Sequence, residues 1–557
     1  MEKIIRGSGF TVSERYLHQL SDRTFLKLWT YPNIFNDRNK APRGDGKELC
    51  DLLVICGDDI LIFSDKAIEW PDCDTLKLQW SRWYRRAIKN SVDQIRGAER
   101  WLRDYPDRIF LDSKCTRRLP IELPPTERRR VHGIAIVRGA YEACSRFFEG
   151  AEGSLTICSH IKGENHTDTT SQGWNPFAIG DVDPKGSFVH VFDETALDRV
   201  MSDMDTITDF IDYLHARATA IRNEDLALCP GESELLAYYM QTENPDDRPC
   251  FLKAVAKASG CDQVALWPGA YEDFVASAAY ARKKKADAVS YLWDELVGQF
   301  VKHIMAGSSV SIFGDEPSAS RAEPALRIMA REGRLRRRVL ADGLAEILRQ
   351  ASGRRENRYA RIIMPGLNNG GGDSELAYVF MTLAHPESEM LEPDYRQVRA
   401  SMLETYCYAV LQDNRRIKRV VGVAMDKPCG LQETSEDLLA LEGVGARTYE
   451  SPRPPHSMRA VRLDAPKRAW RSWSCGSARR QRGRPRPAGR SWCGRGASGR
   501  SGACGGRWRS RRSCAARIRS RAAKPCGPAR RSAECGGPAG SGQQDRRCSA
   551  PQKRVAG

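Results

Sequence analysis

Two apolar segments separated by a short polar turn stand out near the N-terminus. The stretch KELCDLLVICGDDILIFSDK at 47–66 has apolar runs at 52–56 and 60–63, split by Gly57-Asp58-Asp59. Runs of four or five aliphatic residues on either side of a Gly-Asp turn predict a β-hairpin. Strands this apolar are normally buried on both faces.

Each strand of this hairpin also carries charged residues at its end away from the turn. Glu48 and Asp51 open the first strand, and Asp65 and Lys66 close the second. Because the strands of a hairpin run antiparallel, the start of one lies beside the end of the other. We therefore expect Asp51 and Lys66 to lie close together in space.

The flanking patterns predict a mixed α/β domain over residues 1–220. A helix opened by Thr11-Val12-Ser13-Glu14, with Ser13 as its expected N-cap, precedes the hairpin, and a strand at 24–35 contains Pro32, which is typical of an edge strand. An amphipathic helix is predicted at 80–103. Further strands are predicted at 108–111, 132–137, 155–158 and 188–192, followed by a helix at 193–222.

The remainder divides into three parts by pattern. Residues 225–355 are predicted to be mostly helical, with the basic clusters at 282–285 and 334–338 interpreted as solvated helix faces. Residues 356–445 form a small α/β region, with strands in ARIIMP, AYVFMTLAH and RVVGVAMD, a helix at 394–411 and helical periodicity up to SEDLLALEG. The glycine-rich stretch at 366–373 has neither P-loop nor dinucleotide-site spacing, so a plain loop is expected.

The tail at 446–557 has a different composition from the rest of the chain. Arg, Gly, Ala, Ser, Pro, Cys and Trp dominate it, and such a segment is expected to be disordered because it cannot build a core. We interpret it as GC-rich DNA translated out of frame, since it has no repeated motif. The alternative is an Arg/Gly-rich tail that binds nucleic acid through phosphates and stacked bases.

The net charge of +17 belongs to this tail and not to the body. The chain has 88 Lys and Arg and 71 Asp and Glu; residues from 451 onward hold 28 and 3 of these, which leaves 60 and 68 for the first 450. The body is thus mildly acidic, which excludes an argument from bulk charge for a polyanion-binding protein. Any nucleic-acid contact has to come from local patches.

Cysteine usage and hydropathy favour a soluble, cytoplasmic protein. The 18 cysteines contain no CxxC pair and no zinc spacing with histidine, so reduced thiols are expected. The N-terminal stretch MEKIIRGSGFTVSERY lacks the apolar core of a signal peptide, and no apolar run is long enough for a membrane span.

The order helix, edge strand, hairpin and helix over about residues 10–115 resembles the core of the PD-(D/E)XK nuclease superfamily, and within it nuclease-related domains. The matching residues are Glu14 in the first helix, Glu48 and Asp51 at the start of one strand, the Ser64-Asp65-Lys66 sequence at the end of the next, and Gln94 in the following helix. The resemblance implies a restriction-endonuclease-like fold with a mixed sheet flanked by helices.

The resemblance also implies a chemistry and a cofactor. Hydrolysis of a phosphodiester bond needs a hard cation, Mg²⁺ or Mn²⁺, held by carboxylates beside the phosphate, and a group that positions the attacking water. Asp51 would be the principal ligand, with Asp65, Glu48 or Glu14 supplying a second carboxylate. Lys66 would act on the water and the phosphate, with Gln94 nearby.

Ser64 departs from the family pattern, which has a carboxylate two residues before the lysine. In a regular strand Ser64 and Lys66 share a face, while Asp65 points to the opposite one. Either another acid completes the metal site, or catalysis is lost and the fold survives as a scaffold or interaction protein.

Arginines and lysines on the 80–103 helix are candidate nucleic-acid contacts. Arg82, Arg86, Lys89 and Arg96 form a stripe that would meet a phosphate backbone. The alternative is a solvated face over buried tryptophans. DNA is the expected substrate, RNA the second candidate, and no membrane partner is expected. A weaker hypothesis is an unrelated enzyme with its site at 356–430.

Overall fold

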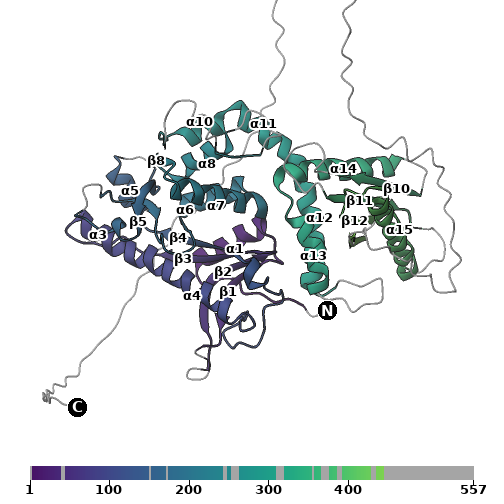
Figure 1. Ribbon diagram of the computed structural model, residues 1–557, viewed down its shortest axis with the longest axis horizontal. Coiled ribbons are helices and arrows are strands. Elements are labelled where there is room, and N and C mark those ends of the chain that lie inside the picture. The colour runs from purple at the N-terminus through teal and green to yellow at the C-terminus, as the bar shows by residue number, and fades with distance from the viewer. Residues whose placement is uncertain are drawn as a thin grey trace, which may run out of the picture. The chain divides into compact units, whose positions relative to one another are not determined.

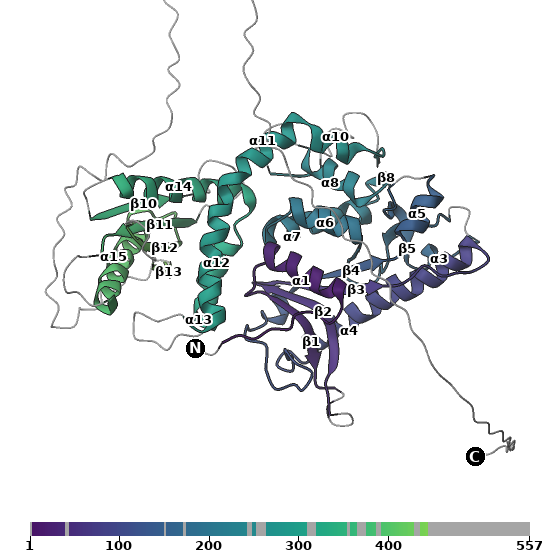
Figure 2. The same ribbon diagram turned by 180° about the vertical axis from the view of Figure 1, so that it is seen from behind.

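The predicted hairpin lies in the middle of a five-stranded mixed sheet in the computed structural model (Figures 1 and 2), where the strand order is β1-β2-β3-β4-β7. The strands are β1 (Thr30–Asn36), β2 (Lys47–Cys56), β3 (Asp59–Ala67), β4 (Arg130–Arg138) and β7 (Val189–Asp193). β1, β2 and β3 pair antiparallel, and β4 and β7 continue the sheet parallel to β3. The predictions of a mixed N-terminal sheet and of an edge strand containing Pro32 are confirmed.

The structure describes residues 3–38, 40, 44–149, 152–170, 174–241, 248–251, 263–308, 319–353, 357–364, 375–385, 392–427 and 435–443. The predictions for the loop at 366–373 and for the tail at 446–557 concern residues outside these ranges. Within the described part of the chain, no helix combines the length and the apolar character needed to cross a bilayer.

Helices cover both faces of the sheet (Figures 1 and 2). On one face lie α1 (Val12–Thr24), α6 (Glu194–Asp203) and α7 (Ile207–Arg222); on the other lie α3 (Leu76–Tyr84) and α4 (Asn90–Asp104). β2 and β3 are therefore covered on both sides, which is why their sequences are continuous apolar runs. The turn between them needs Gly57, whose φ of 66° is in the left-handed region.

The helix predicted at 80–103 begins earlier and is not uniformly α-helical. One π-helical turn, η1 (Arg85–Lys89), joins α3 to α4. Trp80 and Trp83 of α3 are fully buried on the inner face of this helix. Each contributes roughly 3 kcal/mol of hydrophobic stabilisation. These anchors fix the helix against the sheet, so the position of residues further along α4 is set by packing.

Several smaller predictions change in detail. The strand predicted at 108–111 is reduced to isolated bridges of Phe110 with Phe35 and Arg118. The predicted helix at 193–222 divides into α6 and α7 because Asp193 and Thr206 each cap a new helix start. Also present are α5 (Tyr141–Phe147) and a two-stranded parallel sheet of β5 (Thr156–Lys162) and β6 (Ala178–Asp181).

The middle of the chain is mostly helical, as predicted. Its elements are β8 (Leu226–Leu228), α8 (Glu232–Met240), β9 (Val264–Ala265), α10 (Ala270–Ala276), α11 (Ala278–Asp287), α12 (Tyr291–Ala306), α13 (Ala319–Ala330) and α14 (Arg334–Gly353). The interpretation of 334–338 as a solvated face is wrong for three of its arginines, which are buried in ion pairs with Asp205, Asp287 and Asp294. Charges paired in this way are tolerated away from water.

The second α/β region has a four-stranded sheet in the order β10-β11-β12-β13. Its elements are β10 (Arg358–Ile363), β11 (Leu376–Leu383), α15 (Glu392–Asp413), β12 (Arg419–Asp426) and β13 (Glu436–Glu442). The helical periodicity assigned to SEDLLALEG is wrong, since this stretch contains β13. Leu438 and Ala440 pack against one core and Leu439 and Leu441 against another, so both faces of this strand are apolar.

Candidate functional site

The end of the hairpin opposite the turn is where β2 and β3 separate. Their pairing runs from Cys56 and Asp59 at the turn to Leu52 and Phe63. Beyond that point the Asp51 carboxylate takes the place of a backbone acceptor, because its Oδ2 accepts the Asp65 amide at 2.6 Å. This bond fixes a carboxylate that is only 6% exposed at the point where the strands diverge.

Lys66 and Gln94 meet this carboxylate from two further directions. Lys66 Nζ lies 3.5 Å from Asp51 Oδ2, and Gln94 Nε2 of α4 donates to Asp51 Oδ1 at 3.1 Å. The expected proximity of Asp51 and Lys66 is confirmed. Lys66 of β3 and Gln94 of α4 thus contact the two oxygens of a single carboxylate on β2.

Ser64 holds the Gln94 amide in one orientation. Its hydroxyl donates to Gln94 Oε1 at 2.9 Å, and Ser91 lies within reach at 3.2 Å. Since Ser64 occupies the amide oxygen, the Gln94 NH₂ group faces Asp51. Ser64 thus has a specific partner at the position where the family pattern has an acid.

The other two candidate acids are joined through a residue that the sequence analysis missed. Asn33 Nδ2 donates to Glu14 Oε2 at 2.9 Å and to Glu48 Oε1 at 3.0 Å. Asn33 is 2% exposed and has a φ of 48°, a conformation that asparagine tolerates better than most residues. The sequence signal that could have identified Asn33 is its place as a polar residue directly after Pro32 in a mainly apolar strand.

Asp65 is directed elsewhere. Its Oδ1 accepts from Arg138 Nε at 3.1 Å, and its side chain is fully buried. This agrees with the alternation expected along β3, in which Ser64 faces α4 and Asp65 faces the opposite side. The carboxylate of Asp65 therefore belongs to an ion pair at the ends of β3 and β4.

The pKa values of Asp51, Glu48 and Glu14 are shifted in different directions. Burial raises the pKa of Asp51, although Lys66 and two hydrogen bonds favour its charged form. Burial also raises the pKa of Glu48, and the charges of Asp51 and Glu14 add to this effect. For Glu14, hydrogen bonds from Asn33 and the Phe10 amide outweigh burial, so its pKa is lowered. Buried carboxylates with raised pKa values next to a lysine are common at functional sites.

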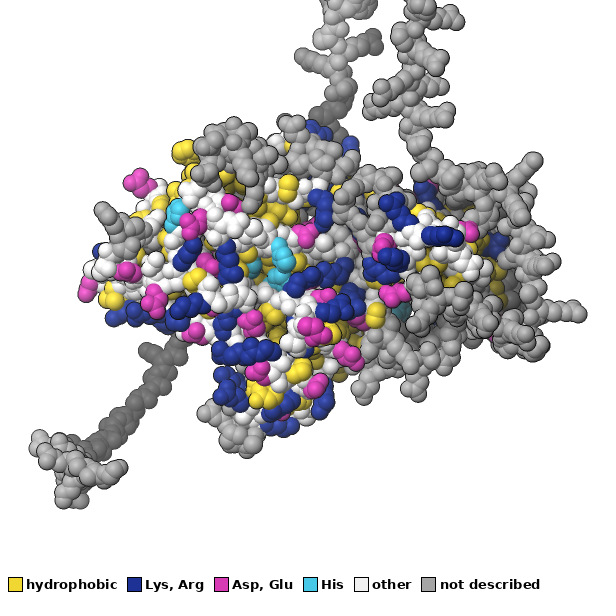
Figure 3. Space-filling view, in the orientation of Figure 1, with side chains coloured by type: hydrophobic (Ala, Val, Ile, Leu, Met, Phe, Trp, Pro, Cys, Tyr) yellow, Lys and Arg dark blue, Asp and Glu magenta, His cyan; other side chains and the backbone are white. Residues whose placement is uncertain are grey.

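The predicted phosphate contacts divide into exposed and paired side chains. Arg82, Arg86 and Lys89 are exposed, and Figure 3 shows lysine and arginine side chains along α3 and α4. Arg82 contacts the Cys73 sulfur and Lys89 pairs with Asp93 at 3.4 Å. Arg96 is committed to the fold, because it pairs with Asp183 and Glu99 and contacts Ser187.

The predicted acids are not the residues whose ligand atoms converge most closely. Among the described residues, three or more such side chains have ligand atoms within 4.8 Å of one another only in the group Asp59, His132 and His215. This group lies at the turn end of the hairpin, away from Asp51. A cation at Asp51 would therefore be held by two protein carboxylates at most, which is a usual arrangement for Mg²⁺ when waters and substrate phosphates complete its coordination.

Comparisons with protein-family models, with characterised proteins and with solved structures find no match to this chain.

Proposed function

We propose that this protein is a Mg²⁺- or Mn²⁺-dependent nuclease that hydrolyses DNA phosphodiester bonds. The observation that carries the proposal is the Asp51 carboxylate, held at the separating ends of β2 and β3 between the Lys66 ammonium group and the Gln94 amide. Each of these residues matches a position in the PD-(D/E)XK pattern, and they come from the two strands of the hairpin and from the helix that follows it.

The order and direction of the elements support the same proposal. A helix, three antiparallel strands, a crossover helix and a parallel strand follow one another as α1, β1, β2, β3, α3 with α4, and β4. This is the arrangement that the restriction-endonuclease-like core implies. The crossover helix carries Gln94 and also presents the exposed arginines and lysine toward solvent.

The bound cation would be held by Asp51 and Glu48 and would supply Lewis-acid stabilisation of the scissile phosphate. Lys66 Nζ, beside Asp51, is placed to orient the attacking water and to offset negative charge that develops on the phosphate. Attack is direct, so no covalent intermediate with the protein forms. Asp65 is assigned to the ion pair with Arg138 and not to the cation.

Ser64 and Gln94 together take the place of the missing acid of the family pattern. Ser64 orients the amide, and the amide holds Asp51 Oδ1, so the carboxylate keeps one orientation without a second charge beside it. This arrangement accounts for a serine at this position in an active site.

The experiment is a cleavage assay on double-stranded plasmid DNA with Mg²⁺ or EDTA, using the full chain. We expect Mg²⁺-dependent cleavage that falls by at least about 100-fold in Asp51→Ala and in Lys66→Ala. Asp93→Ala is the matched control, because Asp93 is an exposed acid on α4 that pairs only with Lys89 at the surface. Unchanged cleavage by both site variants refutes the proposal, and a folded native chain that does not cleave supports the scaffold alternative.

A further inference from the structure

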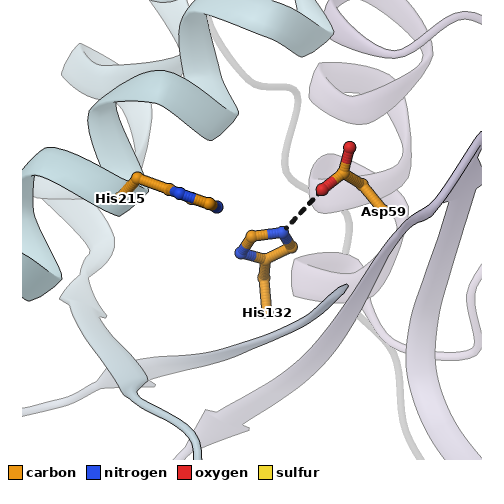
Figure 4. A group of neighbouring side chains, drawn as sticks. All are labelled: Asp59, His132 and His215. Carbon is orange, nitrogen blue, oxygen red and sulfur yellow. Dashed lines mark hydrogen bonds and ion pairs between the residues drawn. The ribbon is translucent and has the colours of Figure 1, made fainter. Parts of the chain in front are cut away.

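A second group of ligating side chains lies at the opposite end of β3 from Lys66. Asp59 is the first residue of β3 and Lys66 is its eighth, so the two ends are about 23 Å apart along the strand. His132 lies on β4 and His215 on α7 (Figure 4). None of these three residues has a role in the proposed nuclease site.

The strand register explains why Asp59 and His132 meet. Leu61 pairs with His132 in the parallel ladder between β3 and β4, and Asp59, two residues before Leu61, points to the same face. His132 Nε2 lies 3.1 Å from Asp59 Oδ1. This is close to the separation of two donor atoms bound to one transition-metal ion at about 2.0–2.1 Å each.

His215 completes the group from the helix that covers this face. Its ring centroid is 5.0 Å from that of His132, and Figure 4 shows the ring directed toward His132 and Asp59. The ligand atoms of all three residues lie within 4.8 Å of one another. His215 is exposed, so the open side of the group faces solvent.

We propose that Asp59, His132 and His215 bind a first-row transition-metal ion such as Zn²⁺. Two imidazoles and one carboxylate favour zinc, cobalt, nickel or copper over Mg²⁺, which prefers oxygen ligands. Three protein ligands leave a coordination position for water, and the exposed side of His215 gives that water access. The site is chemically distinct from the Mg²⁺ site proposed at Asp51 and does not depend on it.

Two arginines donate hydrogen bonds to the Asp59 carboxylate. Arg130 Nη2 and Arg331 Nη1 donate to Asp59 Oδ2 at 2.7 and 2.8 Å, and Arg130 Nε donates to Oδ1 at 2.8 Å. The remaining lone pair of Oδ1 faces His132, so a metal ion between them leaves the arginine bonds in place. Such outer partners orient a ligand.

Arg331 connects the proposed metal site to the helical middle of the chain. It precedes α14, and besides Asp59 it donates to the Cys56 carbonyl at 2.9 Å, which ties the helical middle of the chain to the hairpin turn. β4 already meets Asp59 through Arg130 and His132. A metal ion on Asp59 and His132 would add His215 of α7 to the same point.

The test is calorimetric titration of the full chain with ZnCl₂, with Co²⁺ absorption as a second readout. We expect one Zn²⁺ per chain, with affinity at least about 100-fold lower in His215→Ala, since loss of an outer partner alone costs 10–100-fold. His215 is exposed, so this variant should fold. His160→Ala is the control for surface histidines, because His160 is exposed and contacts Glu224 and Gln263, away from Asp59.

The outcomes separate this proposal from the nuclease proposal. Asp51→Ala should leave Zn²⁺ binding unchanged, and His215→Ala should leave Mg²⁺-dependent cleavage unchanged. Equal Zn²⁺ affinity in the native chain and in His215→Ala, or no Zn²⁺ binding by the folded native chain, refutes the metal site. In that case the group is an ion-pair network of Asp59 with its arginines.

Discussion

Replacing Lys66 by methionine should destabilise the protein in a way that depends on pH. Lys66 Nζ is 3.5 Å from Asp51 Oδ2, and the two side chains are 29% and 6% exposed. At an effective dielectric constant of about 20, this pair has a gross attraction of about 4–5 kcal/mol. Screening by water at Lys66 and the desolvation of the lysine offset part of this, leaving about 2 kcal/mol as the expected net loss.

The direction in which the stability loss changes with pH follows from the protonation of Asp51. Burial raises the pKa of Asp51, and Lys66 lowers it, so removing Lys66 raises the folded-state pKa further. Below the folded-state pKa of the native chain, Asp51 is protonated in both proteins and the deficit vanishes. The deficit grows as pH rises through that value and is complete above the pKa of the variant.

The assay is thermal unfolding followed by circular dichroism at a series of pH values. For a compact unit of this size, with an unfolding entropy of about 2.1 cal/mol/K per residue, 2 kcal/mol lowers Tm by about 2 °C. We expect that shift at neutral pH, a much smaller one in acid, and partial recovery when Mg²⁺ is added. Lys89→Met is the matched control, because Lys89 and Asp93 are about two-thirds exposed and such pairs contribute little. A deficit that is the same at every pH would mean that Lys66 acts through packing and not through charge.

Three further predictions concern other parts of the molecule. Asp294→Asn should lower the free energy of unfolding by about 3 kcal/mol in urea titrations, because the buried Arg334 and Arg337 of α14 each lose an ion pair with Asp294; a loss below 1 kcal/mol would contradict this. Ser64→Ala should lower kcat with little change in KM or Tm because Gln94 loses its fixed orientation, and Ser64→Thr should restore activity; unchanged kcat in the alanine variant would remove the positioning role. Arg86→Ala should reduce the salt dependence of DNA binding by about one phosphate contact, whereas Arg96→Ala should lower Tm instead; an equal salt slope in Arg86→Ala would show that this side chain does not meet the backbone.

The hairpin and the pairing of its charged ends were predictable from sequence because they depend on local patterns. A polar turn between two apolar runs fixes the direction of both strands, and strand direction places Asp51 beside Lys66. The alternation of side chains along a strand likewise placed Ser64 and Asp65 on opposite faces. These features need no knowledge of distant contacts.

The parts that were not predictable depend on partners far along the chain. Arg334 belongs to a basic cluster, and only the folded chain brings Asp205 and Asp294 to it. Asn33 bridges Glu14 and Glu48 through a backbone conformation that the sequence does not reveal. Asp59 and His132 are 73 positions apart, and their meeting depends on the register of two parallel strands.

The most direct test of a functional cation site at the hairpin is calorimetric titration of the full chain with Mg²⁺ and Mn²⁺, comparing the native sequence with Asp51→Ala. The proposed site predicts binding by the native chain that is lost in the variant, with the variant folded as judged by circular dichroism. Equal binding by both proteins, or no binding by a folded native chain, would contradict a cation site at Asp51 and with it the proposed nuclease mechanism.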